Sequence, residues 1–289
     1  GRTLFGRDDE RRTLTDRLIA ERVVLLHAPS GAGKTSLIQA AIIPALEHER
    51  FGISGPLRVN APPGPDVKNR YVWSAVVGLL NSTHAEAAGG ATSLADAVRM
   101  REEQLEVADH VLIFDQFEEL LTADSTDVEE KAAFLDQVGA ALRDRGRWAL
   151  FSMREDWIAG LDPFTRAIPT RFANTYRLDL LGEAAARAAI TQPAADAGVH
   201  FSEAAATKLV NDLRRVRVQR QDVASEELGP SVEPVQLQVV CSRLWDGLPE
   251  GTTEIDEADV EHAGDVDAAL AGYYADRVAA AASQTGVSE

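Results

Sequence analysis

Short apolar runs alternate with longer segments of helical periodicity through about residue 180 of the chain. The apolar runs lack polar alternation, which is typical of parallel strands covered by helices on both faces. Each intervening helical segment is long enough to cross between two neighbouring parallel strands. The pattern therefore predicts an α/β fold with a doubly wound parallel sheet flanked by helices. The expected strands are residues 22–27, 57–60, 111–115, 148–153 and 175–178.

Capping residues and apolar spacing locate the helices of this first part. Asp8 and Ser93 are favourable N-caps, and apolar residues follow each of them at helical spacing. Pro44 lies inside the helix after the first strand, where we expect it to kink the helix or end it early. Gly89 and Gly90 interrupt the chain before the helix that Ser93 caps. The expected helices are residues 8–20, 34–46, 72–80, 93–105 and 128–143.

The strand pattern stops in the second part of the chain, where helical segments follow one another and predict an all-helical subdomain. The polar stretch 219–233 contains Gly229 and Pro230 and is expected to be a loop. We therefore expect a sheet domain at residues 1–181 and a helical lid or winged-helix-like subdomain at residues 182–289. The expected helices of the second part are residues 183–192, 202–214, 235–245, 257–263 and 266–282.

The clearest chemistry lies in the turn between the first strand and its helix, Ala-Pro-Ser-Gly-Ala-Gly-Lys-Thr at residues 28–35. Gly31 and Gly33 let the backbone wrap closely around an anion and donate N–H groups to it. Lys34 can reach the β- and γ-phosphates of a nucleotide, and the Thr35 hydroxyl can bind Mg²⁺. The turn therefore predicts a phosphate-binding loop of a P-loop NTPase. The residues expected to contact the nucleotide are Pro29, Ser30, Gly31, Ala32, Gly33, Lys34, Thr35 and Ser36.

This loop departs from the usual pattern at one position, because Ala28 stands where the first glycine is expected. Alanine is acceptable there if its φ stays negative at the end of the strand. A glycine-bearing turn without a ligand is the simpler alternative. The preceding strand, the following helix and the Gly-Lys-Thr sequence together favour phosphate binding.

Asp115 ends an apolar strand, and together with the phosphate-binding loop it is expected to hold Mg²⁺ through water opposite Thr35. Hydrolysis also needs a group that orients or deprotonates the attacking water. Gln116, Glu118 and Glu119 are the candidates, and we assign Glu118 to this role. The alternative for two of the three is a side chain at the start of a helix that faces solvent.

Arg154 follows the next apolar strand and should project at the same carboxyl edge of the sheet. A cation there can contact the γ-phosphate and report whether it is present. The competing interpretation is an ion pair with Glu155 or Asp156. The expected catalytic group is then Lys34, Asp115, Glu118 and Arg154, with Thr35 and Asp115 at the metal.

The net charge of −17, from 29 basic and 46 acidic residues, argues against a general nucleic-acid or anionic-membrane surface. The acidic run at residues 254–267 lacks fixed ligand spacing and is expected to be solvated surface. The single cysteine, Cys241, indicates a reducing compartment, and no signal peptide or membrane-spanning run is present, so we expect a cytoplasmic protein. The densest basic cluster, expected to be a helix face or loop, is Arg214, Arg215, Arg217 and Arg220.

Taken in order, these segments resemble the STAND class of signal-transduction ATPases, and the resemblance covers nearly the whole chain. The phrase Asp-Gln-Phe-Glu-Glu at residues 115–119 is similar to the bacterial branch often joined to WD40-type repeats or to effector domains. Glu233-Pro234-Val235 stands where the family usually has a more apolar Leu-Pro-Leu near the adenine. The segments that carry the resemblance are Gly6-Arg7 and residues 29–35, 114–121, 153–156, 189–194 and 232–238.

The resemblance implies an ATP- and ADP-binding switch in signalling or defence. ADP would hold a closed monomer, and exchange for ATP would open it for homo-oligomerisation and effector activation. Appended sensor and effector domains would lie outside this chain. The resemblance also adds Phe5, Gly6, Arg7 and Pro234 to the residues expected to contact the nucleotide.

Two other functions compete with a switch that hydrolyses ATP slowly with Mg²⁺. A nucleotide-dependent scaffold with negligible hydrolysis would bind ATP or ADP only for assembly. Gln116 keeps this alternative open, because many related ATPases carry glutamate directly after the Mg²⁺ aspartate. A DNA-processing motor of the same broad fold is disfavoured by the acidic balance and the lack of a basic stripe.

Overall fold

The computed structural model describes residues 4–62, 67–80, 93–220, 223–262 and 275 of the chain. The predicted break at residues 89 and 90 and, apart from residue 275, the predicted helix at 266–282 lie outside these residues. Contacts divide the chain into two compact units. The first comprises residues 8–30 and 34–179, and the second comprises residues 4–7, 31–33 and the described residues from 180 onward.

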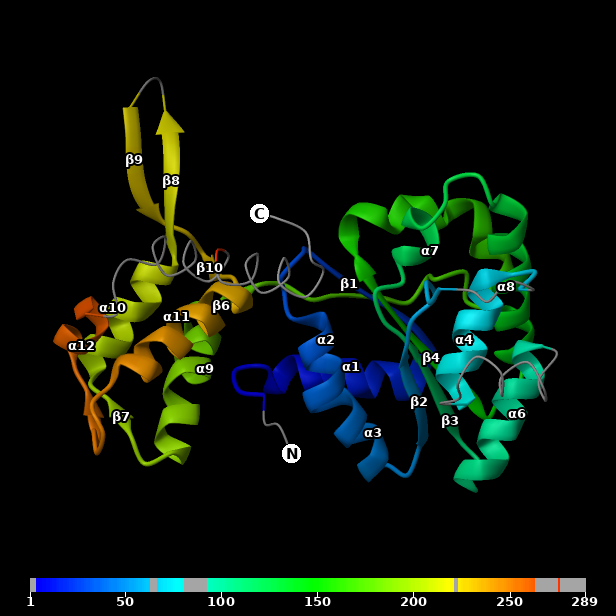
Figure 1. Ribbon diagram of the computed structural model, residues 1–289, viewed down its shortest axis with the longest axis horizontal. Helices are drawn as coiled ribbons and strands as arrows, with labels where there is room; N and C mark the ends of the chain where they lie inside the picture. Colours follow the sequence, from blue (N-terminus) through cyan, green and yellow to red (C-terminus); the bar gives the residue numbers. More distant parts are fainter. Residues whose placement is uncertain (1–3, 63–66, 81–92, 221–222, 263–274, 276–289) are drawn as a thin grey trace. The chain divides into compact units, whose positions relative to one another are not determined.

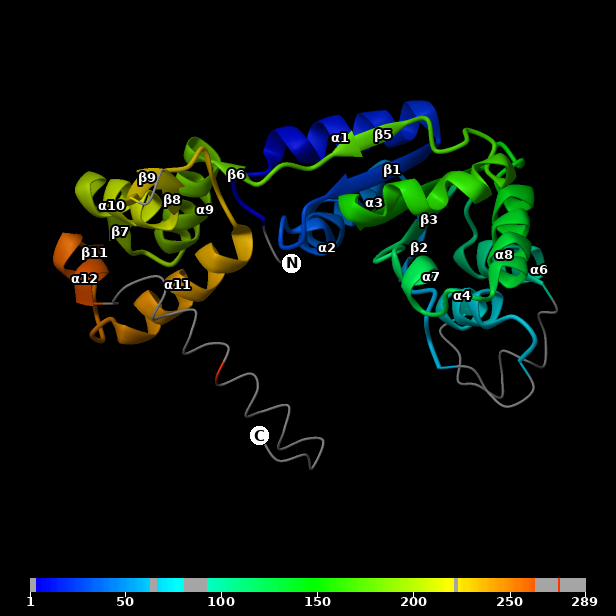
Figure 2. The same ribbon diagram turned by 90° about the horizontal axis from the view of Figure 1, so that it is seen from above.

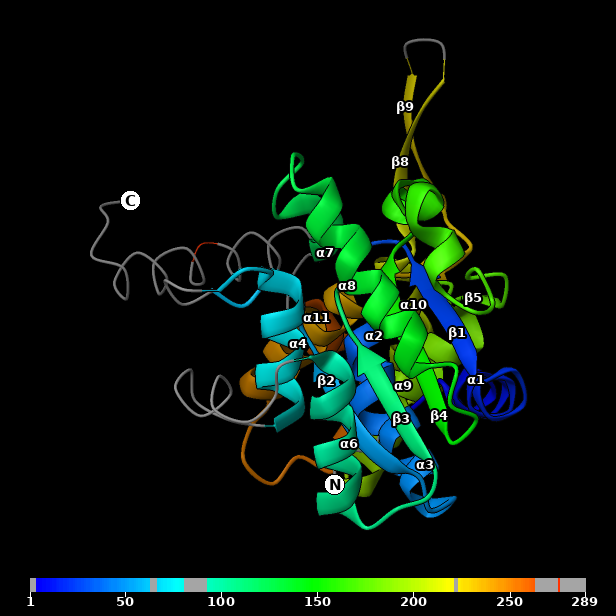
Figure 3. The same cartoon turned by 90° about the vertical axis from the view of Figure 1, so that its right-hand side faces the viewer.

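The first unit is built on five strands: β1 Val23–Ala28, β2 Gly52–Leu57, β3 His110–Phe114, β4 Arg147–Arg154 and β5 Thr175–Arg177. They form one parallel sheet in the order β2-β3-β4-β1-β5 (Figure 3). The order shows that β1 and β3 lie on the two sides of β4. The doubly wound α/β fold predicted from the apolar runs is confirmed.

Helices cover both faces of this sheet (Figures 1 and 2). Helices α4, α6 and α8 pack against one another on one face, whereas α1 packs on β1, β4 and α3. Ser93 caps α6 as predicted, accepting a hydrogen bond from the Asp96 N–H at 3.2 Å. The α-helices of this unit are α1 Asp8–Glu21, α2 Lys34–Leu37, α3 Ile43–His48, α4 Arg70–Leu80, α6 Leu94–Leu105, α7 Glu119–Thr122 and α8 Val128–Ala141.

The strand predicted at residues 57–60 was placed wrongly, because β2 ends at Leu57. Glycine and proline weaken the strand pattern of β2, which contains Gly52, Gly55 and Pro56. The sheet tolerates a proline here because β2 is an edge strand. A Cβ on Gly55 would lie 2.5 Å from the carbonyl oxygen of Ile113, so the close approach to β3 requires glycine.

Pro44 neither kinks nor ends the predicted helix at its own position. Instead the helix passes through a π-helical segment, Ile38–Ile42, before α3 begins, and Pro44 lies in the first turn of α3. The Ile43 N–H bonds to the Ile38 carbonyl, five residues earlier. This wider turn precedes the place where proline would otherwise remove a hydrogen bond and clash with the preceding turn.

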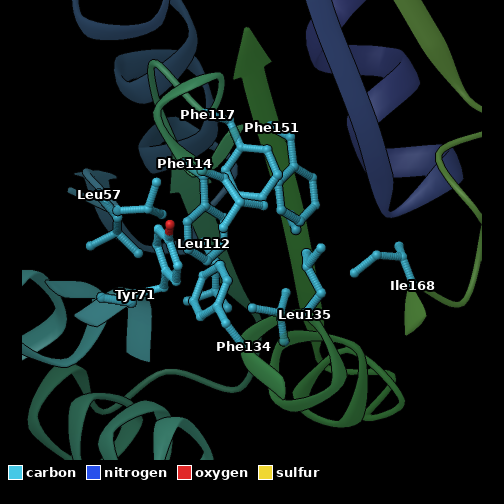
Figure 4. Packing of buried hydrophobic residues seen from close by; sticks show 14 of the residues in the cluster. Leu57, Tyr71, Leu112, Phe114, Phe117, Phe134, Leu135, Phe151 and Ile168 are labelled. Carbon is cyan, nitrogen blue, oxygen red and sulfur yellow. The ribbon is translucent and has the colours of Figure 1, made fainter. Parts of the chain in front are cut away.

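Aromatic side chains fill the core between the sheet and the helices α4 and α8 (Figure 4). Phe114 of β3 and Phe151 of β4 are stacked with 5.1 Å between ring centroids. Phe117 meets Phe151 edge-on at 4.9 Å, and Phe134 meets Phe114 edge-on at 6.3 Å. All four rings are fully buried. The packing fixes the end of β3 and the turn that follows it.

The second unit has its own core, which helices α9 Glu183–Asp196, α10 Glu203–Leu213, α11 Pro234–Gly247 and α12 Glu257–His262 build together. Most of its buried residues are leucine, isoleucine and valine side chains of these helices and of the short strands between them. Ser202 caps α10 by accepting the Ala205 N–H at 3.1 Å. Two short strand pairs also belong to this unit. Strand β6 Leu181–Gly182 pairs antiparallel with β10 Ser231–Val232, and β7 His200–Phe201 pairs parallel with β11 Glu254–Ile255.

The prediction that this second part is all-helical is wrong. Besides the short strands, a two-stranded antiparallel hairpin joins β8 Arg215–Arg220 to β9 Val223–Leu228 (Figure 1). It occupies most of the expected loop at 219–233 and includes three of the four clustered arginines. The sequence of the hairpin contains few apolar residues. The alternating Arg-Val-Arg-Val at its start was therefore not recognised as a strand, and the stretch was predicted to be a loop. Backbone pairing joins the two strands from Arg215 and Leu228 to Arg220 and Val223, and the described apolar side chains Val216 and Leu228 are exposed.

A buried polar network lies at the amino end of the sheet. His110 is completely buried, with Nε2 2.9 Å from Ser54 Oγ and Nδ1 3.4 Å from Glu102 Oε1. Arg147 holds Glu102 with two hydrogen bonds of 2.7 and 2.8 Å. Burial lowers the pKa of His110, the hydrogen bond and charge of Glu102 oppose this, and Arg147 and Arg101 add to the lowering.

We expect His110 to make the protein less stable in mild acid. The unfolded chain binds a proton on this histidine near pH 6.5, while the folded chain binds it only at lower pH. Stability therefore falls as pH drops from about 6.5 toward the lowered value, by at most about 1.4 kcal/mol per pH unit. Urea unfolding at several pH values measures this slope. His110→Asn should flatten it, while His48→Asn at an exposed position should not; equal slopes in both variants would contradict the assignment.

Candidate phosphate-binding site

The predicted phosphate-binding loop connects β1 to α2. Ala28, in the place of the first glycine, is the fully buried last residue of β1, and its φ is not positive. Gly31 and Gly33 have φ values of +78° and +89°. These are the left-handed conformations that glycine adopts without strain. The loop therefore uses glycine at the two positions that require it and tolerates alanine at the strand end.

Lys34 is the first residue of α2, and its ammonium faces backbone oxygens of the same loop. Nζ lies 3.4 Å from the carbonyl oxygen of Ala28 and 3.3 Å from that of Pro29. Burial lowers the pKa of Lys34, and the charges of Glu118 and Asp115 partly oppose this. Both contacts are to neutral carbonyl oxygens, which do not offset the positive charge as an anionic partner such as phosphate would.

Thr35 and Asp115 are brought together although 80 positions separate them in the chain. The Thr35 hydroxyl donates a 2.6 Å hydrogen bond to Oδ2 of Asp115, whose side chain is only 2% exposed. The other carboxylate oxygen, Oδ1, is buried without a hydrogen-bond partner. An unsatisfied buried oxygen beside a hydroxyl is the oxygen donor set that Mg²⁺ prefers. These residues fit a magnesium ion.

The three candidates for the water-orienting role follow Asp115 and differ in their surroundings. Gln116 has a left-handed backbone, with φ of +53°. Glu118 accepts the backbone N–H of Arg154 at 3.2 Å. Glu119 is paired with Arg58, whose Nε donates to Oε2 at 3.0 Å. Neither glutamate is simply a solvent-facing carboxylate at a helix start, which was the alternative drawn from the sequence.

Arg154 lies at the end of β4 as predicted, next to the end of β1 in the sheet register. Its guanidinium forms the ion pair of the competing interpretation, with Asp156 at 2.6 Å. Glu155 pairs instead with Arg177, at 2.9 Å. The Arg154 side chain is 43% exposed, so the ion pair is a weak restraint on it. The role of Arg154 as a γ-phosphate contact stays a prediction.

The tip of the loop, residues 31–33, belongs to the second compact unit, as do Gly6, Arg7 and Pro234. Buried Arg7 donates from Nη2 to the Ala32 carbonyl oxygen at 3.2 Å. A Cβ on Gly33 would meet the Pro234 ring at 3.8 Å. The structure thus brings together the loop tip and two of the positions that the family resemblance added.

The remaining predicted residues have less specific surroundings. Gly6 has a φ of +75°, and a Cβ there would lie 2.3 Å from the Ala185 carbonyl oxygen, so this position requires glycine. Phe5 and Pro29 are half-buried, whereas Ser30 and Ser36 are exposed. Their contacts with a nucleotide stay predictions.

Sequence reasoning missed Arg58, the partner of Glu119. It lies directly after β2, just as Arg154 ends β4, and both belong to the carboxyl edge of the sheet. The wrongly placed strand at residues 57–60 hid this position inside an element. A correct end for β2 at Leu57 would have identified the arginine.

Among the described residues, no group of three or more histidine, cysteine, aspartate or glutamate side chains could hold a metal ion. Within the same residues, no helix has the length and apolar composition needed to cross a membrane.

Solved structures with the same fold include several ATP-related proteins. The Walker-type ATPase paby2304 of Pyrococcus abyssi has a TM-score of 0.57 and 14% identity, over 97% of this chain and 77% of that one. The ORC2 protein of Aeropyrum pernix, in its ADPNP-ADP complexes, has a TM-score of 0.56 and 14% identity, over 91% and 67%. A chain of the HORMA:CdnC:Trip13 complex of E. coli MS115-1 has a TM-score of 0.53 and 13% identity, over 90% and 88%. The TM-scores show a shared fold, and at such low sequence identities the comparison shows the fold alone.

A comparison with curated proteins finds no match. The family described as Novel STAND NTPase 1 matches residues 2–287, almost the whole chain. The match agrees with the phosphate-binding loop and with the Asp115 site beside it, and it makes the protein a nucleotide-binding NTPase. The chain therefore belongs to the Novel STAND NTPase 1 family.

Proposed function

We propose that this chain is an ATP- and ADP-binding switch that hydrolyses ATP slowly with Mg²⁺. The observation that carries the proposal is the 2.6 Å hydrogen bond between Thr35 and buried Asp115, with the second carboxylate oxygen unpaired. Lys34 begins the helix beside them. The three side chains supply a cation for the phosphates and oxygens for a metal at one edge of the sheet.

Thr35 and Asp115 would hold the magnesium ion, the hydroxyl directly and the carboxylate through water. When bound, Mg²⁺ neutralises charge on the phosphate oxygens. Lys34 would bind the β- and γ-phosphates, and the glycine N–H groups of residues 31–33 would orient them. Glu118 would orient the attacking water, and Arg154 would contact the γ-phosphate.

The regulatory part of the proposal rests on the family. Signalling or defence, opening on exchange of ADP for ATP, homo-oligomerisation and appended sensor and effector domains all belong to it. Membership of the bacterial branch joined to WD40-type repeats is part of the same proposal. Within the second unit, Arg7 donates to Ala32 of the loop tip and Pro234 lies close to Gly33, and both are positions that the family resemblance adds to the nucleotide-binding residues.

A scaffold with negligible hydrolysis is the second candidate, and the turn after Asp115 favours it. Gln116 replaces a carboxylate, Glu118 already accepts a backbone N–H, and Glu119 is paired with Arg58. The N–H donor on Oε2 weakens Glu118 as a base for water, and the Arg58 pair does the same for Glu119. We therefore expect ATP hydrolysis by this chain to be slow or absent.

Asp115→Asn is expected to lower Mg²⁺-dependent ATP turnover at least about 100-fold, because it removes the charge that holds the metal. Glu118→Gln should slow turnover about 10- to 100-fold and leave nucleotide affinity near normal. Phosphate release measures the rates, and chelation with EDTA should abolish the wild-type rate.

Asp136→Asn is the matched control, since the same substitution on an exposed face of α8 should not change turnover. If Asp115→Asn and Glu118→Gln both turn over ATP at the wild-type rate, hydrolysis does not use this site. If wild type binds ATP and releases no phosphate, the scaffold is the correct function.

A further inference from the structure

The guanidinium of Arg58 makes a two-point contact that the expected site does not use. Nε donates to Oε2 of Glu119 at 3.0 Å, and Nη2 donates to Oε1 of the same carboxylate. A paired contact of this kind fixes direction as well as distance, because both groups are planar. The hydrogen bond to Glu119 raises the pKa of Arg58, so the guanidinium stays charged.

The backbone that carries Arg58 is itself held in place. The Asp115 N–H donates to the carbonyl oxygen of Leu57 at 3.0 Å, so Arg58 follows β2 at the level where Asp115 follows β3. Buried Ser74 of α4 donates to the Arg58 carbonyl oxygen at 2.7 Å and accepts the Ala61 N–H at 3.0 Å. The guanidinium therefore extends from a fixed point.

The turn after Asp115 is held from its other side by β4. The Phe117 N–H donates to the Ser152 carbonyl oxygen at 2.8 Å, and Glu118 accepts the Arg154 N–H at 3.2 Å. Strands β2 and β4 are the two neighbours of β3 in the sheet. The two consecutive glutamates thus tie the turn to both neighbouring strands, Glu118 to β4 and Glu119 to the residue after β2.

Buried Phe117 and Leu120 hold the middle of this turn, and the two glutamates add contacts to the neighbouring strands. Helix α7 has only four residues, and no side chain caps its start. Gln116 has the positive φ that a non-glycine residue keeps only where its surroundings hold it. The position of Asp115 relative to Thr35 therefore depends on what anchors the turn at each end.

We propose that Arg58 is a positioning residue for Mg²⁺-dependent hydrolysis, acting through Glu119 to hold the turn that places Asp115 beside Thr35. The part that concerns hydrolysis rests on the proposed function. The anchoring itself is a property of the nucleotide-free chain and can be measured without any turnover.

The test compares Arg58→Ala and Glu119→Gln with wild type and with the control Arg99→Ala. Arg99 forms an exposed ion pair with Asp96 at 3.1 Å, away from the turn. In hydrogen exchange of the nucleotide-free chain, amides of residues 117–123 should exchange about tenfold faster in the two test variants, because both variants weaken or remove the two-point charged contact that anchors the turn. Amides of β3 and β4 should be unchanged.

The second readout is turnover. Each test variant should lower kcat about 10- to 100-fold with KM within about twofold of wild type, because misplacing the turn affects the reacting geometry and not the phosphate contacts. The double variant should be no worse than either single one, since both break the same contact. Arg58→Lys should rescue kcat only in part, because an ammonium cannot form the two-point contact.

Each outcome decides something. Wild-type exchange at residues 117–123 in both test variants overturns the anchoring. Faster exchange with measurable wild-type turnover that neither variant changes overturns the role of Arg58 in hydrolysis. If the test variants exchange faster and the wild-type protein hydrolyses no ATP, the result supports the anchoring and refutes the hydrolysis part of the proposed function. Glu119→Gln keeps the side-chain shape and gives the same test if Arg58→Ala does not fold.

Discussion

Lys34→Ala is expected to reduce affinity for both ATP and ADP at least about 100-fold, or ~2.7 kcal/mol. The substitution removes the one ammonium that begins the helix after the phosphate-binding loop. Its pKa is lowered mainly by burial, which means that the charged form pays a desolvation cost that a bound phosphate would offset. Calorimetric titration with each nucleotide, with and without Mg²⁺, measures the loss.

Lys208→Ala is the control for this substitution. Lys208 lies on α10 and pairs with Asp212 and Glu261 at 3.6 Å each, so its removal should leave nucleotide affinity unchanged. The Lys34 variant should also keep its helical signal in circular dichroism, because its Nζ contacts only two loop carbonyls. Unchanged affinity in a folded Lys34→Ala protein would refute the phosphate-binding assignment.

The sheet was predictable where strand identity depends on local sequence. Strands β1, β3 and β4 are mostly apolar and mostly buried, and the pattern located each within one or two residues. The prediction of strand β2 was wrong because β2 contains glycines and a proline, and the proline is tolerated at the sheet edge where β2 lies. That place depends on strand order, which no local window contains.

The sequence did not predict the hairpin or the π-helical segment, for related reasons. Among the described strands, β8 and β9 pair with each other, and their sequences contain many charged and polar residues, which indicated a loop. The π-helical turn at Ile38–Ile42 has an ordinary helical sequence, and only the nearby Pro44 indicates a disturbance. A proline predicts that a helix must adjust, but the adjustment can occur several residues before it.

Part of the candidate site was likewise predictable from local sequence, and part depends on the strand order. Thr35 and Asp115 were predicted as a pair because a loop motif and a strand end each indicate their position, and the 2.6 Å contact agrees. The partners of Glu118 and Glu119 were not predicted, because they come from the ends of two other strands. Knowledge of the strand order would have been needed to place Arg58 and Arg154 on opposite sides of β3.

If the chain is a switch, replacing ADP by a non-hydrolysable ATP analogue should change the distance between labels on its two compact units. A ligand can shift a conformational equilibrium only through different contacts in the two states. The γ-phosphate is the only difference between the two nucleotides, and Arg154 is the proposed group that contacts it. Its present ion pair with Asp156 is largely exposed, so a phosphate could replace it at small cost.

Spin labels at Glu129 and Asp246, both exposed and one in each unit, would report the distance in a Cys241→Ser background. Arg154→Ala should keep ADP affinity within about twofold and lose the ATP-specific change, because ADP lacks the phosphate that Arg154 would contact. Arg166→Ala, at an exposed position of the 3₁₀-helical segment Glu155–Ala167 that follows β4, should behave as wild type. If wild type gives identical distances with both nucleotides, this chain alone is not a switch, and regulation must then come from domains outside it.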